Sequence, residues 1–296
     1  MDNKKCRAFL KWAGGKYALV NEIRSRLPDG QRLIEPFVGA GSVFLNTHYT
    51  EYLLNDINPD LINLYKVLQQ TPDQYIQDAR EFFRASGNQS ETYYQLRDEF
   101  NQSDDSYYRS LLFLYLNRHG YNGLCRYNLS GKFNVPFGRY KQPYFPETEL
   151  RFFAAKAQYA TFVCMPFAEV FALASEGDVI YCDPPYAPIS RTANFTSYAG
   201  SGFPVAEQRS LAQHAIQTMQ SSSVPVLISN HDTELTREIY AQASLSELKV
   251  GRYISQKGHK RKKVDELLAL FHQPVDQHCQ ADNKYRDKHN TDNQVG

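Results

Sequence analysis

Short apolar segments that each end in a turn containing proline or glycine are the strongest constraint on the fold of this chain. Residues 179–182 read Val-Ile-Tyr-Cys and are followed at once by the tetrapeptide Asp-Pro-Pro-Tyr at 183–186. Another apolar segment, Arg32–Glu35, runs into a glycine-containing turn at 36–41, and Glu51–Asn55 follows as the next strand. This order predicts a parallel α/β sheet, which binds ligands beyond the carboxyl ends of its strands.

The α/β pattern is interrupted by a long segment of different character. Residues 72–118 have helical apolar spacing, and residues 120–144 are rich in Asn, Gly, Pro and aromatic side chains, as in a hairpin or loop. Helices are also expected to start near Ser42 and Pro59 and to span 167–175 and 206–220, with further strands at 161–164, 178–182, 225–229, 245–252 and 264–271. We therefore predict a discontinuous α/β domain at 1–57 and 146–271, an insert at 58–145 and a disordered tail at 272–296.

The tetrapeptide at 183–186 contains the groups needed to activate a planar amine, such as the exocyclic amine of a nucleic-acid base. The nitrogen of such an amine is a poor nucleophile, because its lone pair is delocalised into the base ring. The Asp183 carboxylate and the Pro184 carbonyl can accept the two amine hydrogens, and the paired prolines fix the direction of that carbonyl. Tyr186 offers a flat face on which a flipped base can stack. The alternative is a turn that contains two prolines and has no catalytic role.

The turn after Arg32–Glu35 has features of a nucleotide site. Gly39 and Gly41 allow the backbone to approach a ligand closely, although any tight turn between a strand and a helix could contain them. Asp56 ends the next strand, where an acid can accept hydrogen bonds from ribose hydroxyls. The spacing differs from the dinucleotide pattern G-x-G-x-x-G, and Gly-Gly-Lys at 14–16 lacks the frame of a phosphate-binding loop.

Charge is distributed unevenly along a chain whose formal net charge is only +1. Every charged residue at 106–146 and at 248–264 is Lys or Arg, and Tyr and Phe are interleaved with the first of these stretches. Cations beside aromatic rings can hold phosphates and stack bases, so the pattern favours a nucleic-acid partner. Solvated surface is the alternative for each stretch taken alone.

Several protein classes do not fit the sequence. The first residues are polar, without a signal-peptide core, and no apolar run reaches the roughly 18 residues of a membrane-spanning helix. The five cysteines are scattered without a C-x-x-C pair, which argues against a zinc site. The G-x-S-x-G arrangement of many hydrolases is missing. We expect a monomeric cytoplasmic protein that needs no metal ion and no membrane.

Together, these motifs resemble the bacterial Dam-type family of DNA adenine-N6 methyltransferases, which methylate GATC. The resemblance covers residues 6–271. Its main motifs are the lysine–tryptophan segment at 11–16, F-x-G-x-G at 37–41 and the D-P-P-Y tetrapeptide. It extends into the insert, through YLNRHGYNGLCRYN at 115–128 and FNVPFGRY at 133–140. It implies a Rossmann-like, S-adenosylmethionine-dependent catalytic domain whose insert recognises double-stranded DNA.

The resemblance also implies roles for individual residues. The S-adenosylmethionine pocket would contain Trp12, Lys16, Phe37, Gly39, Gly41, Asp56 and Asp183. The flipped adenine would be held by Asp183, Pro184 and Tyr186. DNA would be contacted by Lys11, Tyr121, Asn122, Leu124, Arg126, Pro136 and Tyr140.

The implied DNA contacts differ in kind. Arg126 would pair with O6 and N7 of a guanine in the major groove, and Leu124 with Pro136 would contact a thymine methyl group. The two residues at 121–122 would wedge into the duplex and fill the space left by the flipped base. Lys11 would reach the first base pair, while the tyrosine at 140 would act at the edge of the site. Phosphate contacts would come from Lys132, Arg139, Lys141, Lys257, Lys260, Arg261, Lys262 and Lys263.

Two alternatives remain open at this level. A methyltransferase of the same chemistry could act on another planar amine, such as RNA adenine, cytosine N4 or a glutamine side chain. A protein with the same fold could also bind DNA without catalysis, although the intact Asp183 and Asp56 argue against it. Roles in mismatch repair and replication control are implied by the family resemblance alone.

Overall fold

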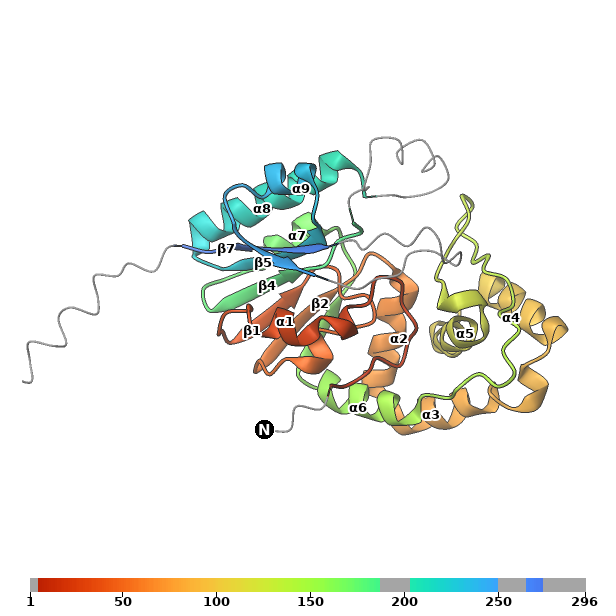
Figure 1. Cartoon of the computed structure of the whole chain (residues 1–296). Helices are drawn as coiled ribbons and strands as arrows, with labels where there is room; N and C mark the ends of the chain where they lie inside the picture. The colour runs from red at the N-terminus through yellow and green to blue at the C-terminus, as the bar shows by residue number, and fades with distance from the viewer. Residues whose placement is uncertain (1–4, 187–202, 250–264, 274–296) are drawn as a thin grey trace, which may run out of the picture.

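Seven strands form one sheet in the computed structural model, which describes residues 5–186, 203–249 and 265–273 (Figure 1). The strands are β1 (Arg32–Glu35), β2 (Glu51–Asn55), β3 (Ala160–Val163), β4 (Asp178–Cys182), β5 (Val226–His231), β6 (Ser244–Leu248) and β7 (Glu266–Phe271). Their order is β3-β2-β1-β4-β5-β7-β6, with β1 to β5 parallel and β7 antiparallel to both neighbours. The predicted Rossmann-like α/β sheet is confirmed.

The direction of strand addition reverses in the middle of the sheet. Ile34 of β1 pairs with Leu53 of β2 on one side and with Ile180 of β4 on the other. The chain runs outward from β1 through β2 to β3 and returns at β4, beside its starting point. The carboxyl ends of β1 and β4 therefore lie next to each other, at the position where α/β sheets bind ligands.

Helices cover both faces of the sheet. One core contains residues of α1 (Val20–Arg24), α2 (Pro59–Gln70) and α6 (Glu147–Ala157), and the other contains residues of α7 (Phe167–Phe171), α8 (Val205–Ser222) and α9 (Glu234–Ile239). Along β4, Val179 and Tyr181 pack into the first core, while Ile180 and Cys182 pack into the second. Both faces of β4 are buried, which explains why its sequence is a continuous apolar run.

A helical layer on the far side of α2 contains α3 (Pro72–Glu81), α4 (Ser90–Gln102) and α5 (Ser106–His119) (Figure 1). α5 is buried at every position from 110 to 119, because α2, α3 and α4 all pack against it. One core runs without a break from Leu33 of the sheet through Leu64 of α2 to Leu112 of α5. The division into 1–57, 146–271 and an insert at 58–145 stays a prediction.

The segment after the glycine turn differs from the prediction. Instead of an α-helix from Ser42, the chain forms a 3-10 helix, η2, at Phe44–Asn46. The Asn46 amide donates to the Ser42 carbonyl at 2.8 Å and the Thr47 hydroxyl donates to the Val43 carbonyl at 3.0 Å. These side chains take the place of main-chain helix bonds and end the helix after one turn.

Other differences concern short or late elements. Helices α1, α6 and α9 were not predicted, and α1 and α9 are too short to show a helical period in their sequences. The strand expected at 245–252 ends as β6 at Leu248. Residues 257–263, with their basic side chains, and the tail beyond residue 273 lie outside the described residues.

Asn55 holds together two of the loops at the carboxyl edge of the sheet. Its side chain is 1% exposed, and its Nδ2 donates to the carbonyls of Pro36 and Met165 at 2.9 and 3.0 Å. Its Oδ1 accepts from the Met165 amide at 3.0 Å. One buried amide group therefore fixes the loop after β1 against the loop after β3.

We expect Asn55→Ala to lower the free energy of unfolding by about 3 kcal/mol, because it leaves several buried main-chain groups without partners. Urea unfolding followed by circular dichroism measures this value. Asn21→Ala is the control, since Asn21 is exposed and its replacement should change stability by less than about 0.5 kcal/mol. Equal stability of the two variants would show that Asn55 is not the clamp.

Candidate active site and nucleic-acid interface

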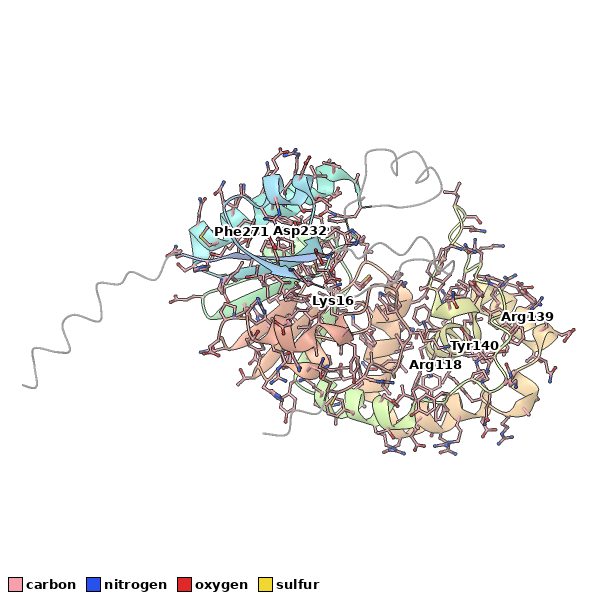
Figure 2. All side chains as sticks on the ribbon, in the orientation of Figure 1. Lys16, Arg118, Arg139, Tyr140, Asp232 and Phe271 are labelled. Carbon is pink, nitrogen blue, oxygen red and sulfur yellow. The ribbon has the colours of Figure 1, made fainter. Side chains whose placement is uncertain are left out.

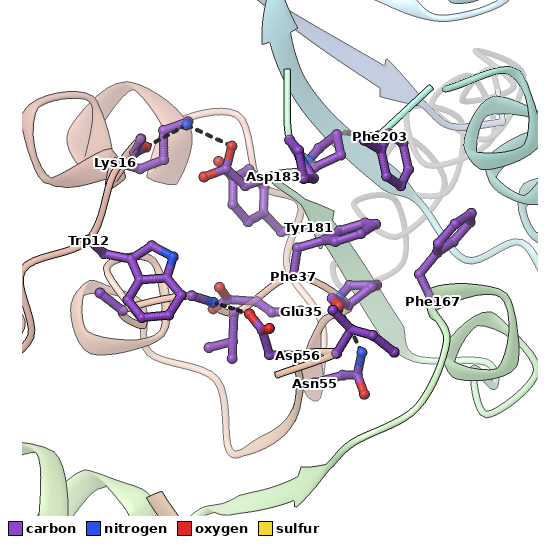
Figure 3. A pocket seen from close by; sticks show the side chains of 18 of the residues that line it. Trp12, Lys16, Glu35, Phe37, Asn55, Asp56, Phe167, Tyr181, Asp183 and Phe203 are labelled. Carbon is purple, nitrogen blue, oxygen red and sulfur yellow. Dashed lines mark hydrogen bonds and ion pairs between the residues drawn. The ribbon is translucent and has the colours of Figure 1, made fainter. Parts of the chain in front are cut away.

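A cavity of about 770 Å³ opens at the carboxyl ends of β1, β2 and β4 (Figure 3). Its walls include all but one of the residues predicted to bind the cofactor or the target base, namely Trp12, Lys16, Phe37, Gly39, Asp56, Asp183, Pro184 and Tyr186. The exception, Gly41, has φ +74° and closes the same turn by donating to the Val38 carbonyl at 2.8 Å. Segments far apart in the sequence thus converge on one site.

Asp183 is held by an ion pair at the centre of this site. Lys16 Nζ lies 2.6 Å from Asp183 Oδ1, and the lysine is only 2% exposed. The ammonium also donates to the Gly14 carbonyl at 2.9 Å. Ser229, buried on β5, donates to the same Asp183 oxygen at 3.1 Å. The carboxylate is therefore held by two residues, of which Figure 3 shows Lys16.

Tyr186 has a defined orientation beside this carboxylate. Its hydroxyl donates to Glu266 Oε2 at 3.0 Å, and its ring meets His231 edge to face with centroids 4.5 Å apart. Lys16 Nζ lies 4.4 Å from the ring centroid. Burial raises the pKa of the Tyr186 hydroxyl, so the side chain stays neutral. A neutral aromatic ring fixed in this way is suited to stacking against a planar group.

The proline turn is fixed by residues that the sequence analysis missed. Gln208 of α8 is fully buried, and its Nε2 donates to the Pro185 carbonyl at 2.8 Å. Asn230 of β5 donates in turn to Gln208 Oε1 at 2.9 Å. With Ser229 and Glu266, these residues support the tetrapeptide from behind. The available signal was polar residues at the end of a buried strand, where apolar residues are expected.

Glu35 is a further residue whose role was not predicted. It ends β1, lines the cavity and is 2% exposed, and its Oε1 has no hydrogen-bond partner among the described residues. Burial, together with the nearby charge of Asp183, raises the pKa of the Glu35 carboxyl to about 8. A buried carboxyl with a free oxygen in a cavity wall is suited to a cationic ligand.

The glycine turn packs flat against an indole ring. Gly39 has φ +47°, and a Cβ added there would lie 2.9 Å from Trp12 Nε1, so no larger residue fits without a shift. The Gly39 amide donates to Asp56 Oδ2 at 3.1 Å, and the Asn58 amide donates to Oδ1 at 2.9 Å. Burial raises the pKa of the Asp56 carboxyl, and these two amides oppose the shift.

The far end of the cavity is aromatic. The Phe37 ring lies 5.5 Å from that of Phe167 and 5.7 Å from that of Phe203, measured between centroids (Figure 3). Phe167 opens α7 and Phe203 precedes α8, so neither was predicted from the motifs. The cavity therefore combines carboxylates at one end with an apolar, aromatic end, as a nucleoside-containing cation requires.

The segment 124–136 forms the predicted hairpin. Tyr127 and Phe133 form an antiparallel bridge, and the Asn134 amide donates to the Arg126 carbonyl at 3.1 Å. Phe133 and Val135 are buried against the helices, whereas Arg126 and Pro136 are exposed. The alternation of side chains along paired strands thus turns one face of the hairpin outward.

The remaining predicted DNA-binding residues meet at the base of this hairpin. Lys11 Nζ lies 3.9 Å from the centroid of the Tyr140 ring, and the Tyr140 hydroxyl accepts from the Asn122 amide at 2.9 Å. Tyr121 is 42% exposed, and Leu124 is half-buried. Arg139 and Lys141 are exposed on either side of Tyr140 in the sequence, whereas Lys132 is exposed near the tip of the hairpin, where its carbonyl accepts from the Asn128 amide at 2.9 Å. Figure 2 shows Arg139 and Tyr140 in this part of the molecule.

Lys11 and Trp12 connect the hairpin to the cavity. Asn117 of α5 accepts from the Lys11 amide at 2.9 Å and donates to the Lys11 carbonyl at 2.7 Å. The indole of Trp12 then enters the cavity wall. Two consecutive residues therefore lie in the two predicted sites, and the sequence did not reveal the asparagine that holds them.

The described residues form neither a metal-binding cluster nor a membrane-spanning helix. No group of three or more His, Cys, Asp or Glu side chains in the described part of the chain is arranged to hold a metal ion. None of the described helices has both the length and the apolar character needed to cross a membrane.

Comparison with known proteins agrees with the site. Residues 12–254 match the family model for D12 class N6 adenine-specific DNA methyltransferases. The DNA adenine methylase of Vibrio cholerae serotype O1 is 60% identical over 90% of this chain and 97% of its own length. Those of Serratia marcescens and Escherichia coli K12 are 61% and 59% identical over 90% of this chain, covering 99% and 96% of their own lengths. The chain belongs to the D12 class of N6 adenine-specific DNA methyltransferases.

Proposed function

We propose that this protein transfers the methyl group of S-adenosylmethionine to the N6 amine of adenine in double-stranded GATC, acting as a monomer on bacterial chromosomal DNA. The observation that supports this most strongly is the Asp183 turn, which lies in the wall of one cavity with Asp56 and Glu35. Relatives named DNA adenine methylases support the choice of base. The GATC sequence and the roles in mismatch repair and replication control rest on the family resemblance of the motifs.

The cavity has the groups that S-adenosylmethionine needs. Asp56, held by two backbone amides, would accept hydrogen bonds from the ribose hydroxyls. Glu35, with its free buried oxygen, would pair with the ammonium group of the methionine part. Phe37 and its aromatic neighbours would contact the adenine ring. When bound, S-adenosylmethionine supplies an electrophilic methyl group on a positively charged sulfur.

The tetrapeptide would activate the target amine. Asp183 would accept a hydrogen bond from one N6 hydrogen and the Pro184 carbonyl from the other, which frees the nitrogen lone pair. The methyl–sulfur bond would break as the nitrogen–methyl bond forms, with S-adenosylhomocysteine as the product, and the displaced N6 proton would leave to solvent. Gln208 occupies the carbonyl of Pro185 and so fixes the plane of the turn. Tyr186 would stack on the flipped base, with its hydroxyl held by Glu266.

The hairpin would supply sequence recognition. Arg126 would read a guanine, and Leu124 with Pro136 would contact a thymine methyl group. The residues at 121–122 would wedge into the duplex, beside the Lys11 and Tyr140 pair that would act at the first base pair. Because Lys11 precedes Trp12, DNA bound at the hairpin would lie next to the cavity.

The first test is methyl transfer from radiolabelled S-adenosylmethionine to three matched duplexes. One contains GATC, one has a scrambled site and one is already N6-methylated at GATC on both strands. We expect label on the first duplex alone. Label on the scrambled duplex as well would leave adenine methylation intact and contradict the GATC specificity. Label on RNA or protein alone would favour the alternative substrates.

Asp183→Ala is expected to lower methyl transfer to GATC duplex by at least about a thousandfold, because the acceptor for the amine hydrogen is lost. Duplex binding, measured by fluorescence anisotropy, should stay within a few-fold of the original protein. Asp29→Ala, at an exposed position, is the matched control for the loss of a carboxylate. An active Asp183→Ala protein would refute the proposed activation.

Stability should also depend on pH through Glu35. Its folded-state pKa of about 8 lies above the usual value of about 4.3, so the ligand-free protein loses stability as pH rises between these values. Glu35→Gln removes that loss, so at pH 8 we expect its free energy of unfolding to exceed that of the original protein by a few kcal/mol. Near pH 4 the two proteins should be equally stable.

Urea titrations at pH 4 and pH 8 measure this difference, with Glu51→Gln as the control at an exposed position. A difference that does not change with pH would contradict a raised pKa. Calorimetry should then show that Glu35→Gln binds S-adenosylmethionine about ten- to a hundredfold more weakly, because the ligand ammonium loses its partner. Unchanged affinity would remove Glu35 from the cofactor site.

A further inference from the structure

We propose that Asn134 is a positioning residue for sequence recognition, which holds the Arg126 guanidinium in the orientation that reads guanine. This inference rests on the proposed function, in which Arg126 contacts a guanine in the major groove. Asn134 holds one edge of the guanidinium and leaves the other edge for DNA. The guanidinium has this orientation before DNA binds.

Asn134 lies opposite Arg126 across the hairpin and contacts it in three ways. The Arg126 Nε donates to Asn134 Oδ1 at 2.7 Å, and Arg126 Nη2 donates to the Asn134 carbonyl at 3.3 Å. The Asn134 amide donates to the Arg126 carbonyl at 3.1 Å. Side chain and main chain of one residue therefore hold both the backbone and the guanidinium of the other.

The hydrogen-bond donors of arginine show what this contact leaves available. A guanidinium has five N–H groups, one on Nε and two on each Nη. Asn134 takes the Nε donor and one Nη2 donor, which are the two on the side edge of the fork. The end edge, formed by Nη1 and the second Nη2 hydrogen, stays directed away from Asn134. That edge provides two parallel donors, as pairing with O6 and N7 of guanine requires.

The support for Asn134 is itself rigid. On one side, the Phe133 amide donates to Asn101 Oδ1 at 2.7 Å, and Asn101 Nδ2 donates back to the Phe133 carbonyl at 3.1 Å. On the other side, the Val135 carbonyl accepts from the Tyr93 hydroxyl at 3.0 Å. Asn101 and Tyr93 both belong to α4, so the strand that contains Asn134 is fixed to a helix of the insert.

The opposite strand is fixed to a different helix. The Tyr127 hydroxyl donates to Asp60 Oδ2 at 2.6 Å, and Asp60 forms an ion pair with Arg109 of α5 at 2.6 Å. Asp60 stands in the first turn of α2, next to the cofactor side of the molecule. Both strands are therefore anchored, and an exposed arginine between them does not have to be ordered by DNA alone. Ordering a long side chain before binding lowers the entropy lost in the complex.

A contact from Asn134 to a DNA phosphate would have a different consequence. Phosphate contacts position the protein but carry no base information, so their loss weakens every sequence about equally. Loss of the arginine orientation instead weakens the correct sequence more than a sequence changed at the guanine that Arg126 reads. The ratio of kcat/KM values between two duplexes therefore separates the two roles.

The experiment measures kcat/KM for methyl transfer on a GATC duplex and on three altered duplexes. Each altered duplex keeps the target adenine pair and has one of the three remaining base pairs of the site changed. The proteins are the original chain, Arg126→Ala, Asn134→Ala, the double variant and Asn134→Asp. Lys132→Ala, at an exposed position on the same hairpin, is the control for a phosphate contact. Thermal unfolding by circular dichroism verifies that every variant is folded.

Arg126→Ala identifies the base pair that the arginine reads. At that pair, Asn134→Ala should lower discrimination by roughly three- to tenfold, and at the other pairs it should leave discrimination unchanged. The double variant should discriminate no worse than Arg126→Ala, because Asn134 acts through the arginine. Asn134→Asp keeps the Oδ1 acceptor and should restore the ratio, and Lys132→Ala should lower all rates without changing it.

The proposal is overturned if Asn134→Ala lowers kcat/KM on all duplexes by the same factor, or if its effect adds to that of Arg126→Ala. Failure of Arg126→Ala to change discrimination at any pair is a separate result. It would contradict guanine reading by Arg126 in the proposed function, and the inference about Asn134 would fall with it.

Discussion

The ion pair between Lys16 and Asp183 is the interaction on which the geometry of the site depends. It joins the segment before β1 to the turn after β4. Strands β1 and β2, helices α2 to α6 and strand β3 lie between these two segments in the sequence. Buried ion pairs often add little net stability, because both charges lose their hydration. What this pair supplies is orientation, since Ser229 donates a second hydrogen bond to Asp183 Oδ1 and the Gly14 carbonyl accepts one from Lys16. With Lys16 fixed, Trp12 and the adjacent Lys11 have little freedom in where they can lie.

That constraint explains how the cavity and the hairpin, the proposed sites of catalysis and of DNA recognition, are held in a fixed arrangement. The core that begins under the sheet continues through α2 to α5, and Asn117 of α5 binds both sides of the Lys11 backbone. The hairpin is fixed in turn to α2 through Asp60 and to α4 through Asn101. In the view of Figure 2, Lys16 lies between the labels of Arg118, Arg139 and Tyr140 on one side and those of Phe271 of β7 and Asp232, which follows β5, on the other. The structure thus has one continuous path of packed and hydrogen-bonded groups between the hairpin and the cavity.

The sequence was a good guide wherever function depends on local order. The bounds of β1, β2 and β4 were predicted correctly, because each is a short apolar run that ends at a turn. Motif residues such as Asp56, Asp183 and Tyr186 were placed together, since strands of a parallel sheet end at one edge. The helix expected at Ser42 was wrong because side-chain bonds from Asn46 and Thr47 override local propensity. Gln208, Ser229 and Asn117 were missed because their value lies in contacts between distant segments, which spacing along one strand or helix does not encode.

The electrostatics of the cavity favour the proposed chemistry in a specific way. Glu35, Asp56 and Asp183 place three carboxyl groups around one volume, and burial raises the pKa of the first two. Burying these carboxylates costs free energy when the cavity is empty, and a cation bound in the cavity offsets that cost. In the proposed reaction, positive charge would develop on the amine nitrogen as it takes the methyl group, and would disappear when the N6 proton passes to solvent. Asp183 would accept a hydrogen bond from that nitrogen, so the carboxylate held by Lys16 and Ser229 would stand where the charge arrives. A carboxylate oriented in advance stabilises that charge without reorganising, which is why its supports matter as much as the residue itself.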